Sequence, residues 1–186
     1  MKDLEMNLKK MKAKFVYEAI GDVLKGKSEE EFLSSVEKSN LNSDDLLVQS
    51  VKVGSLIGVK KALEMGANVH DIYDFALRWA SVKNYLDIVE FLLKNEANVH
   101  AVNDEALRLA SEKGHLDIVE LLLKNGADIH AVNDEALRHA SVNGHLNVVE
   151  FLLKNGADVH AQDNLALRGA SYNSRLDIVE LLKKYM

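Results

Sequence analysis

Residues 100–129 read HAVNDEALRLASEKGHLDIVELLLKNGADI, and residues 130–159 repeat that stretch at about 23 of 30 positions. The same period extends in both directions, since matching residues recur at His70, His100, His130 and His160, at Arg78, Arg108, Arg138 and Arg168, and at Ser81, Ser111, Ser141 and Ser171. Such a period is typical of a solenoid, in which short units bury their apolar faces by stacking on one another. We expect five helix pairs, at about 46–67, 76–97, 106–127, 136–157 and 166–186.

Within one unit the apolar residues predict two short helices. Ala106, Leu107 and Ala110 are spaced for the first helix, which Asp104 is expected to cap. Gly114 is expected to end this helix in a left-handed conformation, where glycine has no side chain to clash. The second helix has its own apolar series and is followed by Asn125-Gly126: Ile118, Val119, Leu122 and Leu123.

These residues carry a family resemblance. The run GHLDIVELLL at 114–123, followed by GADI at 126–129, resembles the ankyrin repeat. The resemblance covers about 46–186 and implies an all-α ankyrin repeat solenoid of stacked helix-turn-helix units. It departs from the family in two respects: the usual TPLHxA is EALRxA here, as at 105–110, and the period is three residues short, the missing residues falling between Val102 and Ala106. This short, proline-free variant is similar to repeats abundant in giant DNA viruses of amoebae.

The composition excludes several classes of protein. The chain has 186 residues, of which 47% are hydrophobic and 28% charged, and a net charge of −6, which fits a folded domain better than a nucleic-acid binder. There are no cysteines, so disulfides and cysteine–zinc sites are excluded. No apolar run is long enough for a membrane span or a signal peptide. We expect a cytoplasmic protein, in the host-cell cytoplasm if the viral resemblance applies.

Residues 1–45 stand outside the period. Leu4, Leu8, Met11 and Phe15 are spaced along one helical face, and Ser28 and Glu31 match a capping box. The favoured interpretation is a helical N-terminal cap or degenerate repeat that shields the first unit. The alternative is a separate helix that binds a partner or dimerises.

The repeated histidines and arginines are better explained by structure than by chemistry. Neighbouring repeats should lie about 10 Å apart, too far for adjacent histidines to share a metal ion. The arginines stand near repeated acids such as Glu105, which favours a network between repeats, although a track for phosphates or acidic ligands stays open. We find no nucleophile elbow, phosphate loop or paired carboxylates. The sequence therefore predicts no enzyme, no cofactor and no metal.

The positions that differ between repeats mark the candidate binding surface. Ankyrin proteins line their concave groove with the end of the first helix, so the resemblance implies that these variable positions face a partner. The predicted partner-binding residues are Phe75, Trp79, Val82, Lys83, Leu109, Glu112, Lys113, His139, Val142, Asn143 and Tyr172. An exposed aromatic residue is a typical anchor, but Trp79 could instead fill the junction with the first repeat.

The sequence thus predicts a protein-protein interaction scaffold or adaptor, which we expect to be a monomer with a protein partner and no nucleic acid or membrane. Two alternatives stay open. One is a structural or self-assembling protein that uses the N-terminal helix, and the other is a reader of phosphates or acidic ligands through the repeated arginines.

Overall fold

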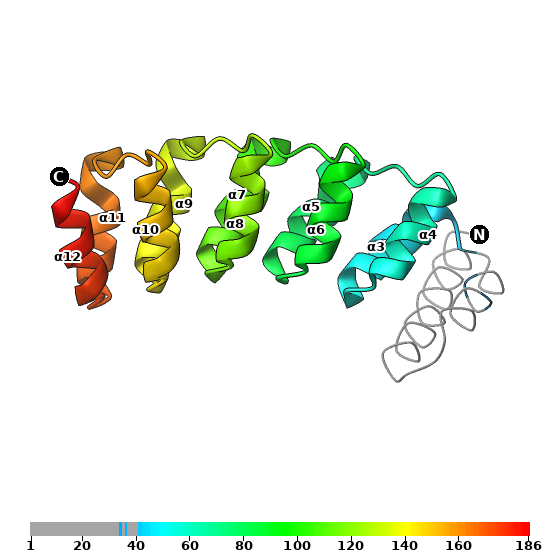
Figure 1. Ribbon diagram of the computed structural model, residues 1–186, viewed down its shortest axis with the longest axis horizontal. Coiled ribbons are helices and arrows are strands. Elements are labelled where there is room, and N and C mark those ends of the chain that lie inside the picture. Colours follow the sequence, from blue (N-terminus) through cyan, green and yellow to red (C-terminus); the bar gives the residue numbers. More distant parts are fainter. Residues whose placement is uncertain (1–33, 35, 37–40) are drawn as a thin grey trace, which may run out of the picture.

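The computed structural model describes residues 34, 36 and 41–186, in which ten helices form five pairs stacked in a row (Figure 1). This part of the chain contains no strand, as the all-α prediction requires. The helices in chain order are α3 (Ser43–Val53), α4 (Leu56–Glu64), α5 (Asp71–Val82), α6 (Leu86–Lys94), α7 (Ala101–Lys113), α8 (Leu116–Lys124), α9 (Ala131–Asn143), α10 (Leu146–Lys154), α11 (Ala161–Tyr172) and α12 (Leu176–Lys184).

Alanines on the first helix of each pair let neighbouring repeats approach closely. Ala110 and Ala140 are fully buried, and the first helices of successive repeats contact one another along most of the row. The second helices carry larger buried residues, such as Ile118 and Leu122, and touch their neighbours much less. Closer spacing on one side bends a solenoid toward that side. The first helices therefore lie on the inner side of the bend.

Left-handed residues separate the helices where the sequence predicts them. Gly54, Gly114 and Gly144 end α3, α7 and α9 with φ of 74°, 76° and 88°. At Gly114 a Cβ atom would lie 2.4 Å from Nδ1 of His145 in the next repeat, so the position excludes a side chain for a second reason.

A left-handed turn that the sequence did not predict opens the first element of each full repeat. Val102, Asn103 and Asp104 all have φ between 54° and 55°, and the regular right-handed part of α7 begins only after them. The expectation that Asp104 caps this helix is wrong. Its carboxylate instead accepts hydrogen bonds from the backbone N–H of Asp128 at 2.9 Å and from Nδ1 of His100 at 3.1 Å. Asp104 thus joins the start of one repeat to its end.

The cap predicted for residues 1–45 lies outside the described residues, apart from 34, 36 and 41–45. Two residues of this segment, Val36 and Leu41, are buried and belong to the hydrophobic cluster that contains Leu46 and Leu47. No helix in the described part of the chain is long and apolar enough to cross a membrane.

Glu96 occupies the position where three other repeats have glycine, and its φ is 68°. Replacing Glu96 by glycine should raise the free energy of unfolding. A left-handed side chain costs about 1–2 kcal/mol, and the greater freedom of glycine in the unfolded chain takes back about 0.4–1 kcal/mol. We expect a net gain of about 0.5–1 kcal/mol in urea denaturation.

Gly126→Ala is the matched control, because Gly126 has φ of 93° and no atom lies within 4 Å of the place where its Cβ would be. Alanine there should cost stability through backbone strain alone. A loss of stability in Glu96→Gly would show that the Glu96 side chain makes a contact outweighing its strain.

Candidate protein-binding surface

Two histidines that directly precede the second helix of their repeat form hydrogen bonds to the preceding repeat. Nε2 of His145 donates to the carbonyl oxygen of Glu112 at 2.8 Å, and Nε2 of His115 donates to that of Val82 at 3.0 Å. Each bond joins the end of one first helix to the repeat that follows. These two histidines therefore have a structural role in joining repeats.

The repeated arginines support the left-handed turns and link them to the next repeat. In α7, Nε and Nη2 of Arg108 donate to the carbonyl oxygens of Asn103 and Val102, each at 3.0 Å. Nη1 of Arg108 donates to the carboxylate of Glu135 in α9. Arg78 binds Glu105 and its own turn in the same way. The network between repeats that the sequence favoured exists at these two junctions.

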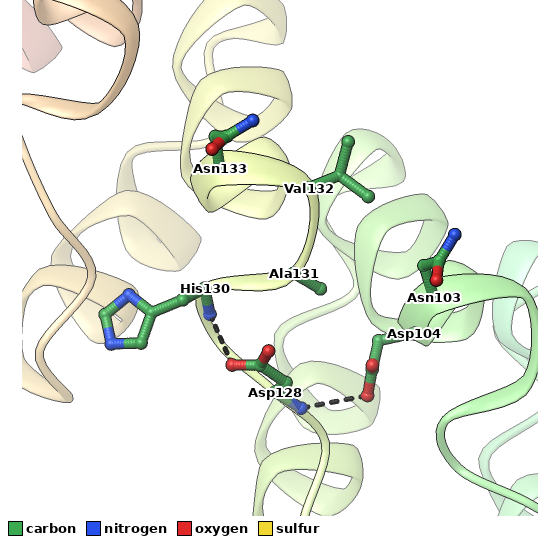
Figure 2. A pocket seen from close by; sticks show the side chains of 7 residues that line it. All are labelled: Asn103, Asp104, Asp128, His130, Ala131, Val132 and Asn133. Atoms are coloured by element: carbon green, nitrogen blue, oxygen red, sulfur yellow. Dashed lines mark hydrogen bonds between the residues drawn. The ribbon is translucent and has the colours of Figure 1, made fainter.

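A polar pocket of about 430 Å³ opens between the turns of α7 and α9 (Figure 2). Its lining comes from both repeats: Asn103, Asp104, Asp128, His130, Ala131, Val132 and Asn133. Figure 2 shows that Asp104 accepts from the N–H of Asp128, while the carboxylate of Asp128 accepts from the N–H of His130. These carboxylates are engaged in holding the junction together, so we assign the pocket to the repeat structure.

The aromatic end of the predicted surface is built on α5. The rings of Phe75 and Trp79 lie with their centroids 5.6 Å apart, and Nζ of Lys83 lies 5.1 Å from the centroid of the Trp79 ring. Trp79 is half-buried and packs against the hydrophobic core. Its Nε1 is buried and has no hydrogen-bond partner among the described residues. Trp79 therefore contributes to the core and is still partly exposed to solvent.

Charged groups gather in the middle of the surface, where α7 meets α9. Glu112 binds Nζ of Lys113 at 2.7 Å and lies 3.7 Å from Nδ1 of His139. Nε2 of His139 lies 3.3 Å from the carboxylate of Glu135. The hydrogen bond from Lys113, together with the charges of Lys113 and His139, lowers the pKa of Glu112 although burial opposes this. The predicted site omitted Glu135, whose only signal in the sequence was that the equivalent residue changes from Phe75 in one repeat to Leu165 in another.

The surface ends on α11 with an exposed aromatic residue. Tyr172 is 90% exposed. Val142 on α9 lies against Gly169, where a Cβ atom would be 2.6 Å from Cγ2 of Val142. Nδ2 of Asn143 donates to the carbonyl oxygen of His139 at 2.9 Å within its own helix. The predicted residues are thus spread over four successive first helices, α5, α7, α9 and α11.

A comparison with known families agrees with this architecture. The family described as ankyrin repeats, in a model of three copies, matches residues 47–133, 77–163 and 107–186. No curated protein sequence matches the chain. Ankyrin repeats are in general protein–protein interaction modules. With matches spanning 47–186 of 186 residues, the chain belongs to the ankyrin-repeat family.

Proposed function

We propose that the chain is a non-enzymatic scaffold that binds a protein partner along the inner face formed by its first helices. The observation that carries the proposal is the pattern of variation within the chain. Residues that build the repeat recur every thirty positions, whereas those on one face of the first helices change. At one position Trp79 is followed by Leu109, His139 and Gly169. Solenoids use their extended concave face for binding, so these residues are placed to select a partner.

The character of this face supports the proposal. It offers an aromatic pair beside lysines at one end, a charged network in the middle and an exposed tyrosine at the other end. Interfaces are enriched in aromatic anchors, with charged and polar groups around them. Arg78 and Arg108 already bind carboxylates of the chain, which counts against a continuous arginine track for phosphates. We further propose a cytoplasmic monomer, which light scattering at several concentrations would test against self-assembly.

Reversing charges on the inner face should weaken partner capture without unfolding the protein. The test variant combines Lys83→Glu, Lys113→Glu and Tyr172→Ala, all at exposed positions. We expect capture of the proteins bound by the wild type to weaken at least about tenfold, because a loss of about 1.4 kcal/mol has that effect. The melting temperature should change little, since exposed substitutions cost within about 0.5 kcal/mol.

The control reverses lysines on the second helices, with Lys124→Glu and Lys183→Glu, which are also exposed. This variant should capture the same proteins as the wild type. Equal loss in both variants would indicate binding through net charge. No loss in the first variant would show that the inner face is not the binding surface.

A further inference from the structure

A link between arginine and glutamate joins first helices at two junctions, and one further junction has the arginine without the glutamate. Between α5 and α7, Arg78 binds Glu105, and between α7 and α9, Arg108 binds Glu135. At the junction of α9 with α11, Arg138 is present but Leu165 occupies the position of the glutamate. The described part of the chain therefore pairs two of these arginines with a carboxylate and leaves the third without one.

Arg138 is nevertheless held in the same orientation as the paired arginines. Its Nε donates to the carbonyl oxygen of Asn133 and its Nη2 to that of Val132, both at 3.1 Å. No described residue accepts a hydrogen bond from Nη1, the atom that binds glutamate in Arg78 and Arg108. Arg138 is also half-buried. The guanidinium group is thus fixed in advance, so less freedom is lost when an anion binds.

At two positions of α11 this junction lacks the polar side chains that the preceding junction has on α9. In the preceding junction His139 follows Glu135 by one helical turn and contacts it at 3.3 Å. The equivalent residue at the open junction is Gly169, which has no side chain and lies against Val142. One turn further on, Tyr172 is almost fully exposed. Both side chains that would compete for the approach to Arg138 are therefore replaced, by leucine and by glycine.

We infer that Nη1 of Arg138 binds an aspartate or glutamate side chain of the protein partner, which takes the place that Glu105 and Glu135 fill at the other two junctions. The inference rests on the proposed function for its partner. The choice of a carboxylate as the ligand rests on the chain itself, in which Arg78 and Arg108 are held in the same way and each bind a glutamate carboxylate. Charge-assisted bonds from arginine to carboxylate are among the stronger hydrogen bonds in proteins. The site sets the register of the partner on the repeats, because it marks one of the three junctions that carry the arginine.

The site can be tested without knowing the partner, on the full chain, with a capped tripeptide Gly-Glu-Gly as the probe. Nitrogen-15 spectra of the arginine Nε–Hε groups report binding at each arginine separately. We expect the probe to shift the Arg138 signal saturably and to leave Arg78 and Arg108 unchanged. The affinity for capped Gly-Gln-Gly should be at least about tenfold lower, since hydrogen bonds to charged groups contribute more than neutral ones. Arg168, which is exposed, serves as the internal control.

One variant should block the site at Arg138, and a second should create an equivalent site at Arg78. Leu165→Glu supplies the missing carboxylate and should abolish the response at Arg138. Glu105→Leu removes the carboxylate bound to Arg78 and should create a response there. The inference would be overturned if either variant did not behave in this way. It would also be overturned by an equal response at Arg168, or by tighter binding of inorganic phosphate than of the tripeptide. If these results hold while inner-face variants capture partners normally, the proposed function fails and the carboxylate site stands.

Discussion

Replacing Asp134 by alanine is expected to lower the free energy of unfolding by about 2 kcal/mol. The side chain is buried, and its Oδ1 accepts from the backbone N–H of Asp158 at 2.7 Å and from Nδ1 of His130 at 3.1 Å. Alanine would remove both of these hydrogen bonds, and each hydrogen bond contributes about 0.5–1.5 kcal/mol net. Urea denaturation would measure the loss.

The chain itself suggests the control for this experiment. The last repeat has Asn164 at the equivalent position, where Oδ1 of Asn164 lies 2.9 Å from Nδ1 of His160. Asp134→Asn keeps an acceptor oxygen and should therefore cost clearly less than Asp134→Ala. Equal losses in the two variants would show that the negative charge of Asp134, and not its hydrogen bonding, stabilises the junction.

Replacing Trp79 by alanine is expected both to destabilise the protein and to weaken partner capture. Emptying a fully buried tryptophan position costs about 3–5 kcal/mol, and since Trp79 is half-buried we expect about 2 kcal/mol. Capture should weaken at least about tenfold, because large aromatic anchors dominate interfaces. Thermal unfolding and quantitative capture on the same preparations would separate the two effects.

Trp79→Leu is the matched variant, because the next repeat carries Leu109 at this position. Leucine retains an apolar side chain against the core but removes the indole ring and its buried Nε1. We expect it to recover most of the stability lost in Trp79→Ala while capture stays weak. Full capture by Trp79→Leu would assign Trp79 to the junction with the first repeat and remove it from the binding surface.

The stacked architecture could be predicted from the sequence because it depends on local patterns repeated many times. Each unit has apolar residues at helical spacing, and glycine stands where the backbone needs a positive φ, as at Gly114. One copy of such a pattern is weak evidence. Several copies in one register indicate units that can bury their apolar faces only against each other.

The left-handed turn at 102–104 could not be predicted in this way. Valine is β-branched, and a positive φ is unfavourable for such residues, so local propensity argues against the conformation of Val102. The turn is held by contacts that form only in the folded chain: Arg108 donates to its carbonyl groups, and Asp104 accepts from Asp128 at the end of the repeat. Side-chain hydrogen bonds, one of them between residues twenty-four positions apart, therefore outweigh the local preference.

The candidate surface could likewise be predicted only in part from the sequence. Variation between repeats identified the stretch from Phe75 to Tyr172, because variable positions can be read from the letters alone. It did not single out Leu165, since a leucine at a position that varies between repeats does not by itself indicate a binding site. Only the folded structure shows that Arg138 is held in place by Asn133 and Val132 without the carboxylate that Arg78 and Arg108 bind. The sequence alone determined a repeat solenoid with a variable face, and the tertiary structure decided which arginine lacks a partner, because that depends on a contact between residues twenty-seven positions apart.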